Sequence, residues 1–108
     1  MSVFEKLNKA IDQNNAGAYI DLLDDDFVFV RHQTGTQINK KEMAQMLEEM
    51  LAKGAQLGKR RLIYENDDIA VMHSFNTYPD NTKEAVIVVH MLKDGKITRM
   101  ETGATPLP

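Results

Sequence analysis

Three histidines are the side chains best suited to acid–base chemistry in this sequence: His32, His73 and His90. Histidine is the residue type whose ordinary pKa lies near neutral pH, so it can give or take a proton under physiological conditions. One neutral histidine can abstract a proton next to a carbonyl while a second histidine or a cation stabilises the oxyanion that forms. The histidines therefore predict proton-transfer chemistry, provided that the fold brings two of them together.

Pairing of two candidate strands would bring His73 and His90 together. The strands 68–78 and 83–93 flank a turn of four residues, Pro79 to Thr82. Symmetric pairing about the middle of that turn makes the two histidines diagonal neighbours on one face of the sheet, about 7 Å apart at the backbone. We therefore assign His73 and His90 as the candidate catalytic residues.

The face that carries the two histidines has a composition that suits the wall of a ligand pocket. On this face the two histidines lie among apolar residues. A polar pair in an apolar wall suits a small molecule with a polar head. Arg31 follows the first strand and would lie at the mouth, where it offers a cation for a carboxylate, enolate or phosphate group. The expected ligand-binding residues are Tyr19, Phe29, Arg31, His32, Phe75, Val88 and Met100.

A structural role for the same residues is an open alternative. Half-buried histidines occur in many sheets, where neighbouring hydroxyls or backbone carbonyls can satisfy them. Met43, Met46 and Met50 fall on one helical face and are typical of core packing, although a methionine wall could also contact an apolar ligand. Whether the chain is an enzyme is therefore left open by its sequence.

Metal and cofactor sites are not expected. The chain has no cysteine, and its three histidines have none of the local spacings that are typical of metal ligands. The acidic run at 24–26 lacks the glycine-spaced loop of a calcium site. We therefore expect neither a metal nor a cofactor.

The composition is that of one globular domain spanning 1–108. Its 108 residues carry 13 basic and 16 acidic side chains, which gives a net charge of −3. This charge argues against nucleic acid and membrane surfaces as partners, and no apolar run approaches the ~20 residues of a membrane span. The N-terminus has no apolar signal core, so a cytoplasmic location is expected.

Hydrophobic periodicity predicts helices followed by strands, which indicates an α+β domain. The last four strands are separated by short turns and should form an antiparallel meander. The three acids at 24–26 would oppose a helix dipole and are expected to form a turn. The expected helices are 2–13, 16–23 and 40–53, and the expected strands are 27–30, 59–66, 68–78, 83–93 and 96–104.

Two motifs accompany this order of elements: an acidic-aromatic entry to the first strand at 24–30, and the turn Asp94-Gly95-Lys96-Ile97 before the last strand. Together they resemble the nuclear-transport-factor-2-like superfamily and its SnoaL-like branch over nearly the whole chain. The resemblance implies a cystatin-like cone, in which N-terminal helices pack on a strongly curved antiparallel sheet and enclose a pocket. It also implies that the sheet face with His73 and His90 looks into this pocket. Members include isomerases, dehydratases, cyclases and proteins without catalysis, so the fold does not define a reaction.

The ketosteroid isomerases of this superfamily use a tyrosine, a carboxylate base and a protonated aspartate. The matching positions here fall near Leu7, near Arg31 or His32, and near Val88. All three groups are missing, so steroid isomerisation by that mechanism is not expected. The acidic catalytic residue of the SnoaL-branch polyketide cyclases has no matching position either.

The opposite face of the sheet is expected to form a homodimer interface. In a monomer it would expose several large apolar side chains, and the dimers of the superfamily bury a surface of this kind. Charged residues on this face could pair across the twofold axis. The expected interface residues are Met72, Met91, Ile97, Arg99 and Glu101.

Two functions are compatible with these patterns. The first is a protein that binds a small, mostly apolar molecule with a polar head, with proton transfer through His73 and His90. The second is a non-catalytic homodimeric association or accessory domain whose cone is filled by its own side chains. An open pocket would favour the first, and a filled cone the second.

Overall fold

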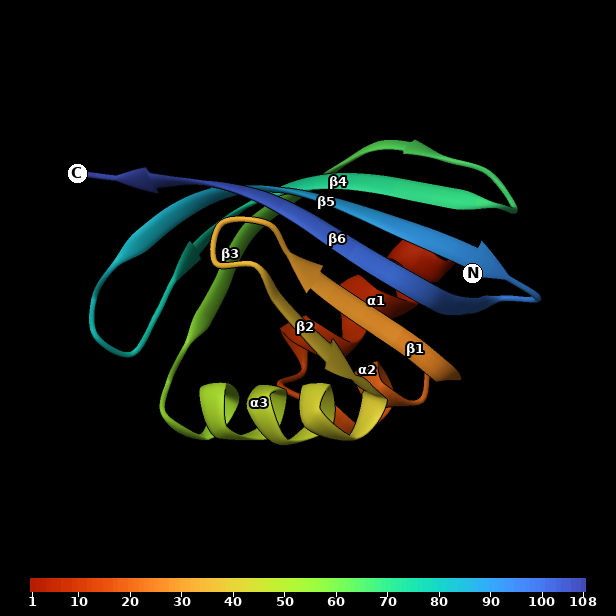
Figure 1. The fold of residues 1–108 in the computed structure, drawn as a ribbon, viewed down its shortest axis with the longest axis horizontal. Coiled ribbons are helices and arrows are strands. Elements are labelled where there is room, and N and C mark those ends of the chain that lie inside the picture. Colours follow the sequence, from red (N-terminus) through yellow and green to blue (C-terminus); the bar gives the residue numbers. More distant parts are fainter.

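Three helices and one six-stranded sheet make up the chain in a computed structural model that describes residues 1–108. The helices are α1 (Val3–Asp12), α2 (Ala16–Ile20) and α3 (Lys40–Ala52). The strands are β1 (Leu23–Arg31), β2 (Thr36–Asn39), β3 (Gln56–Glu65), β4 (Ile69–Thr77), β5 (Lys83–Lys93) and β6 (Lys96–Leu107). The sheet curves around the helices, which all lie on one side of it (Figure 1). This arrangement confirms the predicted α+β cone.

Capping interactions define where the two longer helices begin. The Ser2 side chain accepts a hydrogen bond from the Glu5 backbone, and the Glu5 carboxylate accepts one from the Ser2 backbone. Asn39 and Glu42 make the same reciprocal pair at the start of α3. Such boxes satisfy backbone N–H groups that the first helical turn leaves without partners. Both helix starts follow the predicted positions within a residue or two.

The strands lie in the order β2-β1-β6-β5-β4-β3. The meander from β3 to β6 is antiparallel, as predicted, and β5 turns into β6 through Asp94 and Gly95, which have φ angles of 52° and 77°. Two positive φ angles give the turn a twist that matches the strands. The sheet is not wholly antiparallel, however, because β1 runs parallel to β6.

Two segments near the first strand differ from their predictions. The acids at 24–26 were expected to form a turn but lie within β1, where the pairing with β6 is irregular between Leu23 and Val28. An irregular, outward-facing stretch lets a strand carry charges in water. The short strand β2 was not predicted, because its four polar or half-buried residues have no apolar alternation and are held by pairing with β1.

The hairpin between β4 and β5 corrects the predicted register by one residue. Ala70 pairs with His90 and His73 with Ile87, so the hairpin is symmetric about Asp80 rather than about the Asp80-Asn81 bond. The carboxylate of Asp80 accepts hydrogen bonds from Thr82, and Asn81 adopts φ 67°. A slip of one residue moves a side chain to the other face of the sheet. His73 and His90 therefore lie on opposite faces, and the prediction that they are neighbours is wrong.

The core lies between the helices and the concave face of the sheet. Seventeen buried apolar residues form one cluster there, among which Leu7, Phe27 and Ile97 are almost completely inaccessible. Truncating such a side chain to alanine typically costs about 2 to 5 kcal/mol. His90 is the most deeply buried of the polar residues, with 1% exposure. No helix is long and apolar enough to cross a membrane.

Candidate ligand pocket

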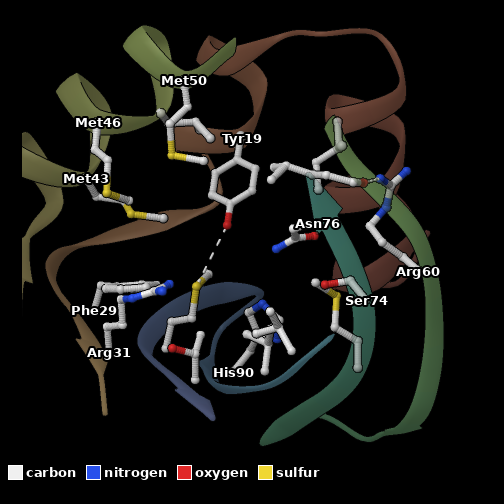
Figure 2. Close-up of a pocket in the computed structure, with 18 of the residues that line it drawn as sticks. Tyr19, Phe29, Arg31, Met43, Met46, Met50, Arg60, Ser74, Asn76 and His90 are labelled. Atoms are coloured by element: carbon white, nitrogen blue, oxygen red, sulfur yellow. Dashed lines mark hydrogen bonds between the residues drawn. The ribbon is translucent and has the colours of Figure 1, made fainter. Parts of the chain in front are cut away.

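A cavity of about 130 Å³ lies between the helices and the concave face of the sheet. Thirteen of its 19 lining residues are hydrophobic. Five of the seven methionines of the chain contribute to its wall: Met43, Met46 and Met50 from α3, Met72 from β4 and Met100 from β6. Figure 2 shows the α3 methionines on one side of the cavity and His90 on the other. The cone is thus hollow, although the hollow is small.

His90 places an unpartnered acceptor on the cavity wall. Its Nδ1 lies 3.2 Å from the carbonyl oxygen of Ala70, which can only accept, so Nδ1 carries the ring proton and donates a hydrogen bond to that oxygen. The other ring nitrogen, Nε2, is then an acceptor, and it is buried with no hydrogen-bond partner in the protein. Burial lowers the pKa of His90 to about 4, partly opposed by the bond to Ala70. The imidazole is therefore neutral at physiological pH.

Two further buried oxygens on the cavity wall lack a hydrogen-bond partner. They are Oδ1 of Asn76 and Oγ1 of Thr102. Thr102 pairs with Val88 and Asn76 with Glu84, so they lie on the same face of the sheet as His90 but at increasing distance along it. A buried polar atom without a partner costs free energy that a bound molecule could recover. These atoms are the polar groups that a ligand would meet.

Tyr19 carries its hydroxyl into the cavity from the helical layer. This side chain is buried, and its hydroxyl donates to the sulfur of Met100 at 3.8 Å, marked by the dashed line in Figure 2. Burial raises the pKa of the Tyr19 phenol above its usual value, so the group stays neutral. A thioether is a weak acceptor, which leaves the hydroxyl free to exchange that partner for a stronger one.

Arg31 lines the cavity and forms an ion pair with Glu84, which lies beside the cavity and not on its wall. Arg31 Nη2 lies 3.0 and 2.9 Å from the two carboxylate oxygens of Glu84. Burial raises the pKa of Glu84, but hydrogen bonds from Tyr78 and Arg31 and the charge of Arg31 outweigh it and hold the pKa below its usual value. Burial also raises the pKa of Tyr78. Arg31 therefore reaches the cavity with its charge already compensated.

The second cation on the wall is compensated as well. The guanidinium of Arg60 pairs with Asp12 and donates to Asn8 at 2.6 Å, both on α1. Only 8% of the Arg60 side chain is exposed. No aspartate or glutamate lines the cavity. The pocket consequently offers neither an unpaired cation nor a carboxylate to a charged ligand.

Five of the seven predicted ligand-binding residues line this cavity: Tyr19, Phe29, Arg31, Val88 and Met100. The other two lie elsewhere. His32 is 61% exposed, with its Nε2 2.8 Å from Oε1 of Glu101, and Phe75 is 49% exposed on the outer face. The candidate catalytic pair is not assembled, because His73 shares that outer face and stacks edge-on against Phe75 at 4.8 Å.

The one-residue register error also concealed several lining residues. Met72, Ser74 and Asn76 face the cavity from β4, whereas their odd-numbered neighbours were expected to do so. The alternation of the sequence did not reveal them, since polar residues such as Ser74 and Asn76 are expected to face water, whereas here they face the cavity. Arg60 could not have been foreseen, because its place on the wall depends on the irregular pairing of β3.

The predicted outer face also needs correction, for Met72 because of the β4–β5 register and for Ile97 because the pairing of β5 with β6 shifts between Met91 and Leu92. Met72 is 7% exposed and Ile97 is completely buried, so neither can belong to a surface on that face. Met91, Arg99 and Glu101 do lie on it, and Arg99 Nε is 2.9 Å from Oε2 of Glu101. The apolar part of the outer face consists of Val71, Phe75, Ile87, Val89 and Met91, together with His73.

The sequence matches the model of the SnoaL-like domain family over residues 4–100. The chain therefore belongs to the SnoaL-like family, within the nuclear-transport-factor-2-like superfamily. A search of curated proteins found no significant sequence match.

Solved structures share the fold at low sequence identity. A nuclear-transport-factor-2-like protein of unknown function from Cytophaga hutchinsonii has a TM-score of 0.79 at 13% identity, covering 95% of this chain and 87% of its own. A Kribbella flavida protein provisionally named a ketosteroid isomerase has a TM-score of 0.80 at 17% identity, covering 98% and 77%. A ketosteroid-isomerase-like protein from Catenulispora acidiphila, solved with trimethylamine, has a TM-score of 0.71 at 13% identity, covering 94% and 83%.

Proposed function

We propose that this protein binds a small, mostly apolar molecule that donates a hydrogen bond to His90. The observation that carries the proposal is the unpartnered Nε2 of His90, buried on the wall of a mostly apolar cavity. A ligand donor at this atom would satisfy it, and the methionines and Phe29 would cover the apolar part of the ligand. Apolar lining with a few fixed polar groups is the usual character of small-molecule sites.

The same geometry favours binding over proton-transfer catalysis. His90 is the single histidine on the cavity wall, so a second histidine is not available to stabilise an oxyanion. Its burial also makes it a weak base, because the pKa of about 4 lies well below the operating pH. We therefore assign His90 as a ligand-binding acceptor rather than a catalytic base.

Side-chain methyl NMR of the full chain tests this proposal. Small neutral alcohols and phenols would be added singly, and trimethylammonium would be added as a charged comparison because the Catenulispora protein was solved with trimethylamine. We expect a neutral donor to perturb side-chain methyl signals of the cavity wall, such as those of Val86 and Val88, and to leave those of outer-face residues such as Val71 unchanged. Perturbation of the outer face alone, or of no residue by any probe, would refute the proposal.

A second candidate function is self-association through the outer face, and two observations favour it. Ile87 and Phe75 are 41% and 49% exposed within the apolar part of that face. Beside them, Glu101 contacts both His32 and Arg99, so the surface carries one carboxylate and two basic groups. In a twofold dimer the carboxylate of one copy could face the basic groups of the other. This self-complementary charge points to another copy of this chain as the occupant.

Analytical ultracentrifugation tests the association. We expect the unaltered chain to sediment as a dimer and Ile87→Glu to sediment as a monomer, because a charge in an apolar interface is costly. Lys83→Glu changes a charge at the end of the same strand and is the matched control, which should remain dimeric. A monomeric unaltered chain would exclude this candidate.

A further inference from the structure

We propose that the ligand is a neutral phenol with a single aromatic ring, whose hydroxyl donates to Nε2 of His90. This inference rests on the proposed function and adds the chemical class of the ligand. Four properties of the cavity support it: its volume, the side chains of its wall, the compensation of its charges, and the kind of polar atom left without a partner.

The volume of the cavity limits the ligand to about one ring. It measures about 130 Å³, close to the roughly 150 Å³ of an engineered apolar cavity that binds benzene. A fused two-ring or four-ring molecule would need the helices to move away from the sheet. A single ring with one small substituent fits the space between α3 and the sheet.

The wall of the cavity suits an aromatic ring. Five methionine sulfurs or their methylene groups face it, along with the rings of Phe29 and Tyr19. Thioethers make favourable contacts with aromatic rings, and unbranched methionine side chains adapt to a ring's flat shape. Aromatic pairs add about 0.5 to 1.5 kcal/mol beyond the area that they bury. A flat ring therefore gains more here than an aliphatic group of the same size.

The charges of the wall favour a neutral ligand. Both of its cations are already paired, Arg31 with the Glu84 carboxylate and Arg60 with Asp12. A benzoate or phosphate would have to break one of these pairs or remain unpaired in an apolar cavity, and either course is costly. An ammonium ion would likewise find no carboxylate on the wall.

The unpartnered atoms require a donor on the ligand. Nε2 of His90 can only accept, because Nδ1 holds the ring's proton against Ala70. A phenolic hydroxyl is more acidic than an aliphatic one, since its pKa is near 10, and is therefore the stronger donor. Thr102 lies diagonally across the strand pair from His90 and can accept or donate to the same ligand.

Calorimetric binding of four probes to the unaltered chain tests the inference: phenol, benzene, cyclohexanol and benzoate. Phenol should bind about three- to tenfold more tightly than benzene, which lacks the donor. It should also bind more tightly than cyclohexanol, which has the donor but no aromatic ring, and benzoate should not bind measurably. His90→Phe should remove the preference for phenol over benzene, whereas His73→Phe on the outer face should keep it.

The outcomes distinguish failure of the phenol assignment from failure of the proposed function. Equal or tighter binding of cyclohexanol would overturn the phenol assignment and leave the proposed function in place, because cyclohexanol also carries a donor. Equal or tighter binding of benzene or benzoate, or a preference for phenol that survives His90→Phe, would overturn both, because the proposed function requires a donor to His90. Failure of all four probes would overturn both the phenol assignment and the proposed function, and the comparison within the unaltered chain does not depend on whether the variants fold.

Discussion

The hydroxyl of Tyr19 lies 3.8 Å from the sulfur of Met100, and Met100 is in turn the strand partner of His90. A phenol from the helical layer and an imidazole from the sheet thus lie on either side of one thioether. Neither polar group has a strong partner toward the cavity. These two side chains therefore place polar groups on both the helical and the sheet side of a mostly apolar cavity.

Loss of the Tyr19 hydroxyl should have little effect on stability. Because its partner is a weak acceptor, Tyr19→Phe should change the free energy of unfolding by less than about 1 kcal/mol. Tyr19→Ala, which also removes the buried ring, should cost about 3 to 5 kcal/mol. Urea unfolding of both variants measures the two effects. A loss in Tyr19→Phe as large as that in Tyr19→Ala would mean that the hydroxyl has a strong partner.

Acid should destabilise the protein through His90. The pKa of this group is about 4 in the folded chain and near 6.5 in an unfolded one. The unfolded state binds the proton more tightly, so stability should fall as the pH drops from about 6.5 towards 4, by on the order of 3 kcal/mol from this residue.

Urea unfolding at pH 7 and pH 4.5 checks this dependence. The unaltered chain should lose more stability over the interval than His90→Leu, in which the titrating group is absent. The variant keeps the carboxylates, so its remaining pH dependence serves as the baseline. Parallel pH profiles for the two proteins would contradict the buried, neutral state of His90.

The ion pair of Arg31 with Glu84 should respond asymmetrically to truncation. The Glu84 side chain is 7% exposed and the Arg31 side chain is 26% exposed, and Arg31 also donates to Gln33. Arg31→Ala leaves a buried carboxylate and should cost about 2 to 4 kcal/mol. Glu84→Ala leaves a cation that reaches water and should cost less.

A double variant provides the control for the ion pair. Arg31→Ala combined with Glu84→Ala should be more stable than Arg31→Ala alone, because it removes the unpaired carboxylate. Thermal and urea unfolding measure all three variants. A larger loss of stability in Glu84→Ala than in Arg31→Ala would contradict this explanation, because it would mean that the unpaired cation costs more than the unpaired carboxylate.

A large side chain added at Gly103 should weaken dimer formation without changing the fold. This residue lies within β6 opposite Ile87, and an added Cβ would meet no atom within 4 Å. Gly103→Arg should therefore leave the fold intact and shift the protein toward monomer. Sedimentation together with circular dichroism measures the two properties. A dimer that persists in this variant would place the interface elsewhere.

Local sequence patterns were sufficient to predict most of the fold. The capping pairs of Ser2 with Glu5 and of Asn39 with Glu42, and the turn at Asp94 and Gly95, each depend on residues a few positions apart. Interactions of this range can be recognised without knowledge of the tertiary structure. The helices predicted over 2–13 and 40–53 and the antiparallel meander are therefore confirmed, whereas the helix predicted over 16–23 ends at Ile20 and Leu23 already belongs to β1.

The candidate site was predicted less well because it depends on strand register. The turn before β5 is compatible with two symmetric pairings of β4 with β5. The observed pairing is accompanied by a hydrogen bond from the Thr82 backbone to Asp80 and by the positive φ of Asn81, which the sequence pattern does not predict. One residue of difference exchanges His73 for Met72 on the cavity wall. Tyr19, Phe29 and Arg31 lie outside this hairpin, so their place on the wall did not depend on that pairing.

The imidazole nitrogens of His90 offer the most direct measurement of the central claim. Long-range ¹H–¹⁵N NMR of the full chain near pH 7 should find a neutral ring with the proton on Nδ1, and saturating phenol should shift the Nε2 resonance as it accepts a hydrogen bond. Nε2 that already carries the proton, or that keeps its resonance when phenol saturates the protein, would contradict the account.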